Sequence, residues 1–259
     1  MSRLHVEVAG EGPPLVLLHG WAMHGGVFGP LATRLREDFT LHVVDLPGHG
    51  GSRDAGMPLS IESCVRAVAG VVPPAPWFGW SLGGMVALQA AHAMPNRVPA
   101  LGMICASPRF VRGDDWRLGV SPELVRDFAT GLRADWRGTL DRFIALEAFG
   151  SDDARGEIRA LRETVLARGE PDASVLAEGL DVLDRADLRP LLPTLAVPSL
   201  WLAGRRDRLV DPRAMAAAAE MAPGAELRVV EHAGHAPFLT HADAVAAHVR
   251  DFLGRVRDA

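Results

Sequence analysis

The segment 78–84 reads FGWSLGG and carries a serine in the pattern Gly-x-Ser-x-Gly. It follows a short apolar run and opens a helix-like segment, the context in which this pattern forms a sharp strand-to-helix turn. Glycines flank such a serine because larger side chains would collide with the neighbouring strand and helix. The pattern indicates Ser81 as an acyl-transfer nucleophile, with the N–H of Leu82 facing the same point. A glycine-rich turn with an incidental serine is the alternative when this motif is taken alone.

A histidine that could act as the base follows the last apolar run, in the segment EHAGHAPF at 231–238. His232 directly follows the predicted strand, so we interpret it as structural. Gly234 permits a tight turn that would bring His235 inward, and we predict His235 as the base that takes the serine proton. His241 begins the last predicted helix and is interpreted as a surface or capping residue.

The acid that orients such a histidine should follow the preceding strand, SLWLAG at 199–204. Asp207 lies in the loop just after this strand. Asp211 stands directly before a proline, which is typical of the N-cap and first residue of a helix. We therefore predict Asp207 as the acid. Asp45, in DLPGHGGS at 45–52, precedes the serine in the chain and is interpreted as part of a structural turn.

An oxyanion site is predicted after the early strand LVLL, where the chain continues His19-Gly20-Trp21. In a serine hydrolase, two backbone N–H groups aimed at the developing oxyanion stabilise it, at about 3 kcal/mol for one donor. We expect the N–H groups of Trp21 and Leu82 to supply them, and the Trp21 indole to form a wall of the acyl pocket. His19 is expected to order this loop through hydrogen bonds without touching substrate.

The composition of the 259 residues excludes several other chemistries. The chain has no lysine and no tyrosine, so neither can be a catalytic base. Its two cysteines, Cys64 and Cys105, form no C-x-x-C pair, and we expect buried thiols with no metal and no organic cofactor. The formal net charge of −5 predicts no nucleic-acid or membrane partner. Neither a secretory leader nor a membrane helix is predicted, so we expect a cytoplasmic monomer.

Short apolar runs alternate with helix-like segments along most of the chain, which predicts a mostly parallel sheet flanked by helices. The predicted strands are 4–8, 15–19, 41–45, 77–80, 100–106, 199–204 and 226–231. The predicted helices between them are 31–37, 60–70, 82–94, 212–221 and 241–256.

Residues 112–188 break this alternation with four helical segments, 121–133, 136–149, 153–168 and 173–183. We predict an all-helical cap at 112–188, inserted before the last strands over the carboxyl edge of the sheet, where ligands bind in open α/β sheets. Residues 1–111 and 189–259 would form the core domain. Nucleophile, acid and histidine occur in the order of an α/β-hydrolase, each after a strand, which predicts that fold and a serine hydrolase.

The chain resembles the pimeloyl-acyl-carrier-protein methyl ester esterases of biotin synthesis along nearly its whole length. The likeness is carried by LLHGWAM at 17–23, LHVVDLPGHGGSR at 41–53, GWSLGG at 79–84, RFIALEAFG at 142–150 and HAGHAPF at 232–238. It implies hydrolysis of a methyl ester on a pimeloyl chain held by acyl carrier protein. The catalytic triad would be Ser81, Asp207 and His235. The residues implied to bind substrate are Trp21, Ser81, Leu82, Phe143, Ile144, Ala145, Leu146, Glu147 and His235.

The same resemblance implies that arginines of the cap dock the acidic carrier protein. Arg142, Arg155 and Arg159 stand at the expected positions, and the last two are four residues apart on one helix face. Guanidinium groups suit carboxylates and the phosphate of a phosphopantetheine arm. An ordinary solvated helix surface is the alternative, because the stretch 133–168 has as many acids as arginines. These acids are Asp135, Asp141, Glu147, Asp152, Asp153, Glu157 and Glu163.

Three other functions compete with this prediction. A general short-chain carboxylesterase would use the same catalytic residues without carrier specificity. A lyase or carbon–carbon hydrolase could use the same triad, and a non-catalytic receptor could bind a ligand on the same fold. A dehalogenase or epoxide hydrolase is disfavoured, because its nucleophile is a carboxylate and position 81 is serine.

Overall fold

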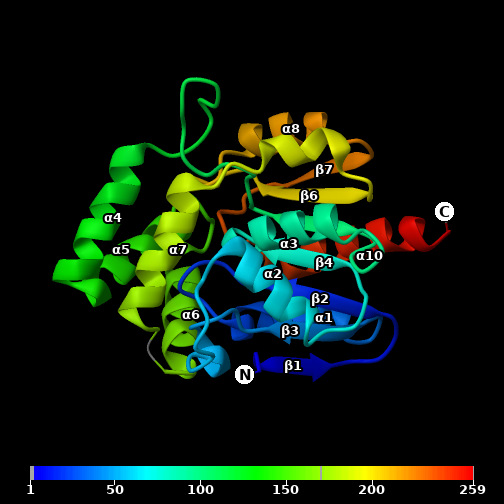
Figure 1. The fold of residues 1–259 in the computed structure, drawn as a ribbon, viewed down its shortest axis with the longest axis horizontal. Coiled ribbons are helices and arrows are strands. Elements are labelled where there is room, and N and C mark those ends of the chain that lie inside the picture. Colours follow the sequence, from blue (N-terminus) through cyan, green and yellow to red (C-terminus); the bar gives the residue numbers. More distant parts are fainter. Residues whose placement is uncertain (1–2, 170, 259) are drawn as a thin grey trace.

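One seven-stranded sheet runs through the computed structural model, which describes residues 3–169 and 171–258 (Figure 1). The strands are β1 (Val6–Ala9), β2 (Pro14–Leu18), β3 (Thr40–Val44), β4 (Trp77–Trp80), β5 (Leu101–Ile104), β6 (Ser199–Gly204) and β7 (Ala225–Val230). Their order in the sheet is β1-β3-β2-β4-β5-β6-β7. Only β1 is antiparallel to its neighbour, so the predicted mostly parallel sheet is confirmed.

The four central strands are buried almost throughout because helices cover both faces of the sheet. This explains why their sequences are continuous apolar runs rather than alternating ones. Helices α2 and α3 lie against one face, and α1 and α10 pack together on the other (Figure 1). The core helices are α1 (Gly29–Leu35), α2 (Ile61–Ala69), α3 (Leu82–Ala93), α8 (Pro212–Met221), α9 (Pro237–Thr240) and α10 (Ala242–Asp258). Short 3₁₀ helices are η1 (Gly25–Phe28), η2 (Gly50–Ser52) and η3 (Arg189–Thr194).

Four further helices connect β5 to β6 and lie beyond one end of the sheet, at the left of Figure 1. They are α4 (Pro122–Ala134), α5 (Trp136–Glu147), α6 (Ala154–Ala167) and α7 (Ala173–Arg185), and they match the four predicted helical segments. Each begins after a Ser or Asp whose side chain accepts a backbone N–H of the first turn. The limits 112 and 188 for a separate cap domain remain a prediction; below, the cap means α4 to α7 with their connecting loops.

Ion pairs hold the base of the cap where the chain leaves and re-enters the core. Arg109, before the cap, bonds Asp115 and Asp187, and Arg189, after the cap, bonds the same two carboxylates. A further ion pair joins the cap to the core at the end of α6, where Nη1 of Arg168 lies 2.9 Å from Oδ2 of buried Asp45. The cap is therefore attached to the core by charged contacts at its base and at the far end of α6.

Both cysteines are buried free thiols, as expected. Within the part of the chain that the structure describes, no helix has both the length and the apolar character needed to cross a membrane.

Candidate active site

The backbone is strained at four points along the carboxyl edge of the sheet. Among the described residues, four that are not glycine have positive φ: Ala22, Ser81, Cys105 and His232. They follow the strands β2, β4, β5 and β7, respectively, and each lies within four residues of its strand's end. Strained backbone of this kind costs free energy and is typical of functional sites. The candidate site therefore lies along this edge, below the cap.

Ser81 forms the N-cap of α3 with φ 53° and ψ −119°, so the chain reverses sharply between β4 and α3. A Cβ atom at Gly79 would collide with the backbone of Gly83, and a Cβ at Gly83 would collide with the carbonyls of Leu18 and His19. The two glycines of the motif are thus required by close backbone approach, as the sequence predicts. Ser81 is nearly buried, at 6% exposure.

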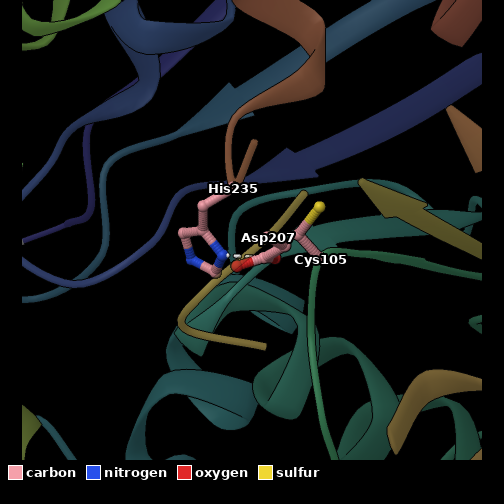
Figure 2. A group of neighbouring side chains, drawn as sticks. All are labelled: Cys105, Asp207 and His235. Atoms are coloured by element: carbon pink, nitrogen blue, oxygen red, sulfur yellow. Dashed lines mark hydrogen bonds and ion pairs between the residues drawn. The ribbon is translucent and has the colours of Figure 1, made fainter. Parts of the chain in front are cut away.

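His235 and Asp207 form a buried hydrogen-bonded pair (Figure 2). Nδ1 of His235 lies 2.8 Å from Oδ2 of Asp207, and both side chains are inaccessible to solvent. The other carboxylate oxygen, Oδ1, accepts the N–H groups of Leu209 at 2.8 Å and Val210 at 2.9 Å. Because a carboxylate only accepts hydrogen bonds, Nδ1 of His235 must carry the proton and leave Nε2 able to act as a base.

The turn that carries His235 is fixed from three sides. Trp80 donates its indole N–H to the carbonyl of His235 at 2.8 Å, and the His235 N–H donates to the carbonyl of Glu147 in the cap. Gly204, at the end of β6, lies so close to the Gly234 carbonyl that a Cβ there would collide with it. Nε2 of His235 is buried and has no hydrogen-bond partner among the described residues. The imidazole is thus held in place with its basic nitrogen unoccupied.

The competing histidine and aspartate lie elsewhere. His232 is exposed and faces Arg206, whose Nη2 lies 2.8 Å from its Nδ1. Asp211 is the N-cap of α8 and accepts the N–H of Arg213 at 2.8 Å. The burial and hydrogen-bond partners of the side chains thus favour His235 as the base and Asp207 as the acid over His232 and Asp211.

The loop after β2 lies against the serine. A Cβ at Gly20 would be only 3.2 Å from Cβ of Ser81 and 3.0 Å from the Trp80 ring, so the chain here passes directly beside the elbow. This close approach supports the prediction that Trp21, the next residue, supplies an oxyanion donor through its N–H. Leu82 is the first residue of α3, where a backbone N–H has no partner within the helix.

His19 and Asp45 support this loop. Nδ1 of His19 lies 2.8 Å from the Gly20 carbonyl, and Nε2 accepts the N–H of Leu46 at 2.8 Å. Burial lowers the pKa of His19 to about 3, so it stays neutral and keeps these bonds. Asp45 accepts the N–H groups of Gly25 and Gly51 as well as Arg168. Both residues support the loop structurally, as the sequence suggests.

The residues implied to bind the acyl chain face in different directions. Phe143 is buried and packs edge-on against Trp21, with ring centroids 4.6 Å apart. The Trp21 indole N–H donates to the Leu176 carbonyl of α7 at 2.9 Å, so the Trp21 side chain joins core and cap. Ile144 is buried and borders a cavity of about 380 Å³ between α5 and α6, on the cap itself. Glu147 is buried, Leu146 is half-buried and Ala145 is exposed.

Cys105 lies beside the acid–base pair (Figure 2). Its Sγ, a carboxylate oxygen of Asp207 and a ring nitrogen of His235 lie within 4.8 Å of one another, a grouping that could hold a metal ion. A metal would have to replace the hydrogen bond between His235 and Asp207. Burial, followed by the charge of Asp207, raises the pKa of the thiol well above its usual value, so it remains protonated. The set fits a hydrogen-bonded catalytic pair better than a metal site.

The three arginines predicted to dock a carrier protein all have exposed side chains on the cap. Arg142 lies on α5 and bonds Thr139 of the same helix, while Arg155 and Arg159 lie on α6. Among the described residues, none of the three forms an ion pair. They are therefore available to an acidic partner, in contrast to Arg162, which is paired with Asp141.

Sequence reasoning missed several residues near the site. Trp80 stands out in the sequence only as a member of the motif, yet it holds the His235 turn. The charged stretch 133–168 suggests that its acids face water, but Glu157 is buried, as is Glu147, which the resemblance implies to bind substrate. A signal existed for Glu157, because it stands four and eight residues before Leu161 and Val165, which are also buried. A helix face with that spacing points inward whatever its residue types.

Comparison with known proteins identifies the fold and the family of the chain. A family model described as alpha/beta hydrolase fold matches residues 13–242. The pimeloyl-[acyl-carrier protein] methyl ester esterase of Stenotrophomonas maltophilia (strain K279a) is 54% identical over 256 residues, which cover 99% of this chain and 98% of the relative. The protein of the same name from Xanthomonas campestris pv. campestris (strain B100) is 56% identical over 250 residues, covering 96% and 98% of the two chains.

The fold is also similar to that of a solved thermophilic esterase from Thermogutta terrifontis. That structure superposes with a TM-score of 0.83 at 26% identity and covers 98% of this chain and 93% of the other. Sequence and structure thus place the chain among the same enzymes. The chain belongs to the α/β-hydrolase fold family and, within it, to the family of pimeloyl-[acyl-carrier protein] methyl ester esterases.

Proposed function

We propose that this chain is a serine carboxylesterase that hydrolyses the methyl ester of pimeloyl-acyl-carrier protein to pimeloyl-acyl-carrier protein and methanol, in biotin synthesis. The observation that carries the substrate is the identity of 54–56%, over almost the full length, with relatives of that name. The observation that supports the chemistry is the buried His235–Asp207 pair beside the Ser81 elbow.

In the proposed mechanism, Ser81 Oγ attacks the ester carbonyl while Nε2 of His235 takes its proton. Asp207 holds the imidazole with its proton on Nδ1 and stabilises the positive charge that forms on the ring. The N–H groups of Trp21 and Leu82 donate to the tetrahedral oxyanion. His235 then returns the proton to the leaving methoxide oxygen, methanol departs and an acyl-Ser81 intermediate remains.

The cap would bind the rest of the substrate. Phe143 and Trp21 pack edge-on against each other in the loop and helix next to the serine turn. Methylene groups of an acyl chain bound against these rings would contribute about 0.8 kcal/mol each. The exposed guanidinium groups of Arg142, Arg155 and Arg159 suit the acidic carrier and its phosphopantetheine phosphate. The predicted cytoplasmic location and monomeric state belong to this proposal, and size-exclusion chromatography tests the latter.

Growth without biotin is the experiment that tests the substrate. The gene is expressed in a bacterium that lacks its own pimeloyl-acyl-carrier-protein methyl ester esterase, beside the variant Ser81→Ala. We expect growth with the wild-type chain and none with the variant. A wild-type chain that hydrolyses small esters but does not restore growth would favour the general short-chain carboxylesterase. Hydrolysis with no methanol among the products would instead favour the lyase or carbon–carbon hydrolase.

A further inference from the structure

The loop between α5 and α6 packs on both turns that carry the acid–base pair. This cap loop comprises residues 148–153. Just before it, the carbonyl of Glu147 accepts the N–H of His235 at 3.2 Å. At Gly150, whose φ is 88°, a Cβ atom would lie 3.0 Å from the carbonyl oxygen of Arg206 and 3.2 Å from its Cβ. The position of the cap loop and the positions of the two turns therefore depend on one another.

The side chain of Arg206, the residue before the proposed acid, joins the cap loop to the histidine turn. Its Nη1 donates to the carbonyl of Gly150 at 3.2 Å and to the carboxylate of Asp152, both in the cap loop. Its Nη2 donates to Nδ1 of His232 at 2.8 Å, in the turn after β7. A guanidinium carries five N–H groups in a rigid plane, so it can hold several acceptors at fixed angles at once.

The backbone of Arg206 joins the acid turn to the histidine turn as well. Its N–H donates to the carbonyl of Ala233 at 2.9 Å, two residues before His235. The intervening contact with His232 meets a residue whose φ is 63°, a strained conformation that persists only where the surroundings hold it. Arg206 therefore contacts all three segments around the acid–base pair: its own turn, the histidine turn and the cap loop.

We propose that Arg206 is a positioning residue of the proposed esterase reaction. It fixes the cap loop on the acid and histidine turns, and thereby sets where the imidazole of His235 stands relative to Ser81. This inference rests on the proposed serine esterase mechanism. Asp207 orients the ring through Nδ1, but the ring moves with its backbone, and a misplacement of about 1 Å can lower a rate by about 10²-fold.

Position and stability can be separated at this residue. The side chains of Arg206 and Asp152 are 40% and 56% exposed, and ion pairs exposed to this extent contribute little to folding. Variants that lose the pair should therefore fold, and a change in kcat then reports the placement of the base. The acid–base pair itself is inaccessible to solvent, so release of the cap loop should also let water reach it.

Steady-state hydrolysis of a p-nitrophenyl ester tests the proposal. We expect Arg206→Gln to lower kcat by about 5- to 30-fold with KM changed by less than about 2-fold, because the base is misplaced while the ester site remains. Arg206→Lys keeps the charge but not the fork of donors, and should recover part of the loss. Arg205→Gln is the matched control, since Arg205 is the exposed neighbour and its side chain bonds Glu231 rather than the cap. It should keep the kcat of wild type.

Asp152→Ala removes the same link from the side of the cap. We expect a smaller loss of kcat than in Arg206→Gln, and a double variant no slower than Arg206→Gln alone, because both changes break one contact. Losses that multiply in the double variant would overturn the proposal, as would an equal loss in Arg205→Gln.

Proton NMR of the hydrogen bond between His235 and Asp207 gives a readout that stability alone would not move. The proton on Nδ1 should resonate far downfield, and its loss in Asp207→Asn assigns it. In folded Arg206→Gln we expect this proton to exchange with solvent faster than in wild type; an unchanged exchange rate and an unchanged kcat would overturn the proposal. If Arg206→Gln does not fold, the same two measurements on Asp152→Ala decide. Failure of the esterase mechanism itself would look different, because wild type would then show no turnover.

Discussion

Replacing Asp207 by Asn tests how the proposed acid acts, because the change keeps the shape of the side chain and removes its charge. Oδ1 accepts two backbone N–H groups, from Leu209 and Val210, and Oδ2 faces Nδ1 of His235. In the variant, the amide oxygen should stay with the two N–H groups. A flip of the amide would leave the N–H groups of Leu209 and Val210 unsatisfied, at about 1–3 kcal/mol each. The unflipped orientation is therefore preferred by at least roughly 30-fold.

The amide NH₂ of the substituted side chain then points at Nδ1 of His235, which can accept it only without a proton. The histidine proton moves to Nε2, and the base that should receive the serine proton is lost. We expect kcat to fall by about 10⁴-fold, or about 5.5 kcal/mol in the activation free energy, with KM little changed. Steady-state hydrolysis of a p-nitrophenyl ester measures the loss.

Asp211→Asn is the matched control, because Asp211 lies in the same loop and caps α8. It should leave kcat unchanged and lower the free energy of unfolding by about 1 kcal/mol at most. A loss of less than 10-fold in folded Asp207→Asn would refute the role assigned to Asp207.

Three further predictions concern the histidine turn, the cap surface and acid stability. Trp80→Phe removes the indole donor to the His235 carbonyl but keeps an aromatic ring, and should lower kcat about 3- to 10-fold; an unchanged kcat would show that this bond does not position the base. Arg155→Glu with Arg159→Glu should raise KM about 10-fold or more for a carrier-bound ester and leave a small ester unaffected; equal effects on both would exclude carrier docking here. Burial lowers the pKa of His19 to about 3 and of His49 to about 4, so the unfolded chain binds protons below pH 6.5 that the folded chain refuses. The free energy of unfolding should therefore fall as pH drops from 6.5 to 4, by about 1.4 kcal/mol per pH unit for each histidine. In thermal melts recorded across this pH range, the melting temperature of His49→Gln should fall less steeply with pH than that of wild type; an equal dependence on pH would contradict this prediction.

Most of the fold could be predicted because its strands are short apolar runs bounded by glycine and proline. The catalytic residues could be predicted for a similar reason, since each follows one of these strands. His235 could be ranked above His232 because Gly234 permits the turn, and Asp211 could be set aside because Pro212 marks a helix start. These features depend on residues close together in the sequence, so they can be predicted before the fold is known.

Contacts between core and cap could not be predicted. Arg168 and Asp45 are 123 residues apart, and the sequence shows no pattern that joins them. Glu157 lies in a helix rich in charges, ARGEIRALRETVLA, where a carboxylate is expected to face water. Its spacing from Leu161 and Val165 indicates an inward-facing position, but the elements that cover it there follow only from how α6 packs in the fold.

Methanol release from pimeloyl-acyl-carrier protein methyl ester tests the central claim most directly. Wild-type protein and Ser81→Ala are incubated with the purified carrier-bound ester, and methanol and the free carrier-bound acid are measured together. We expect equal amounts of both products from wild type and none above background from the variant, with the fold of the variant unchanged by circular dichroism. Comparable methanol from Ser81→Ala, or no methanol from wild type, would contradict the account.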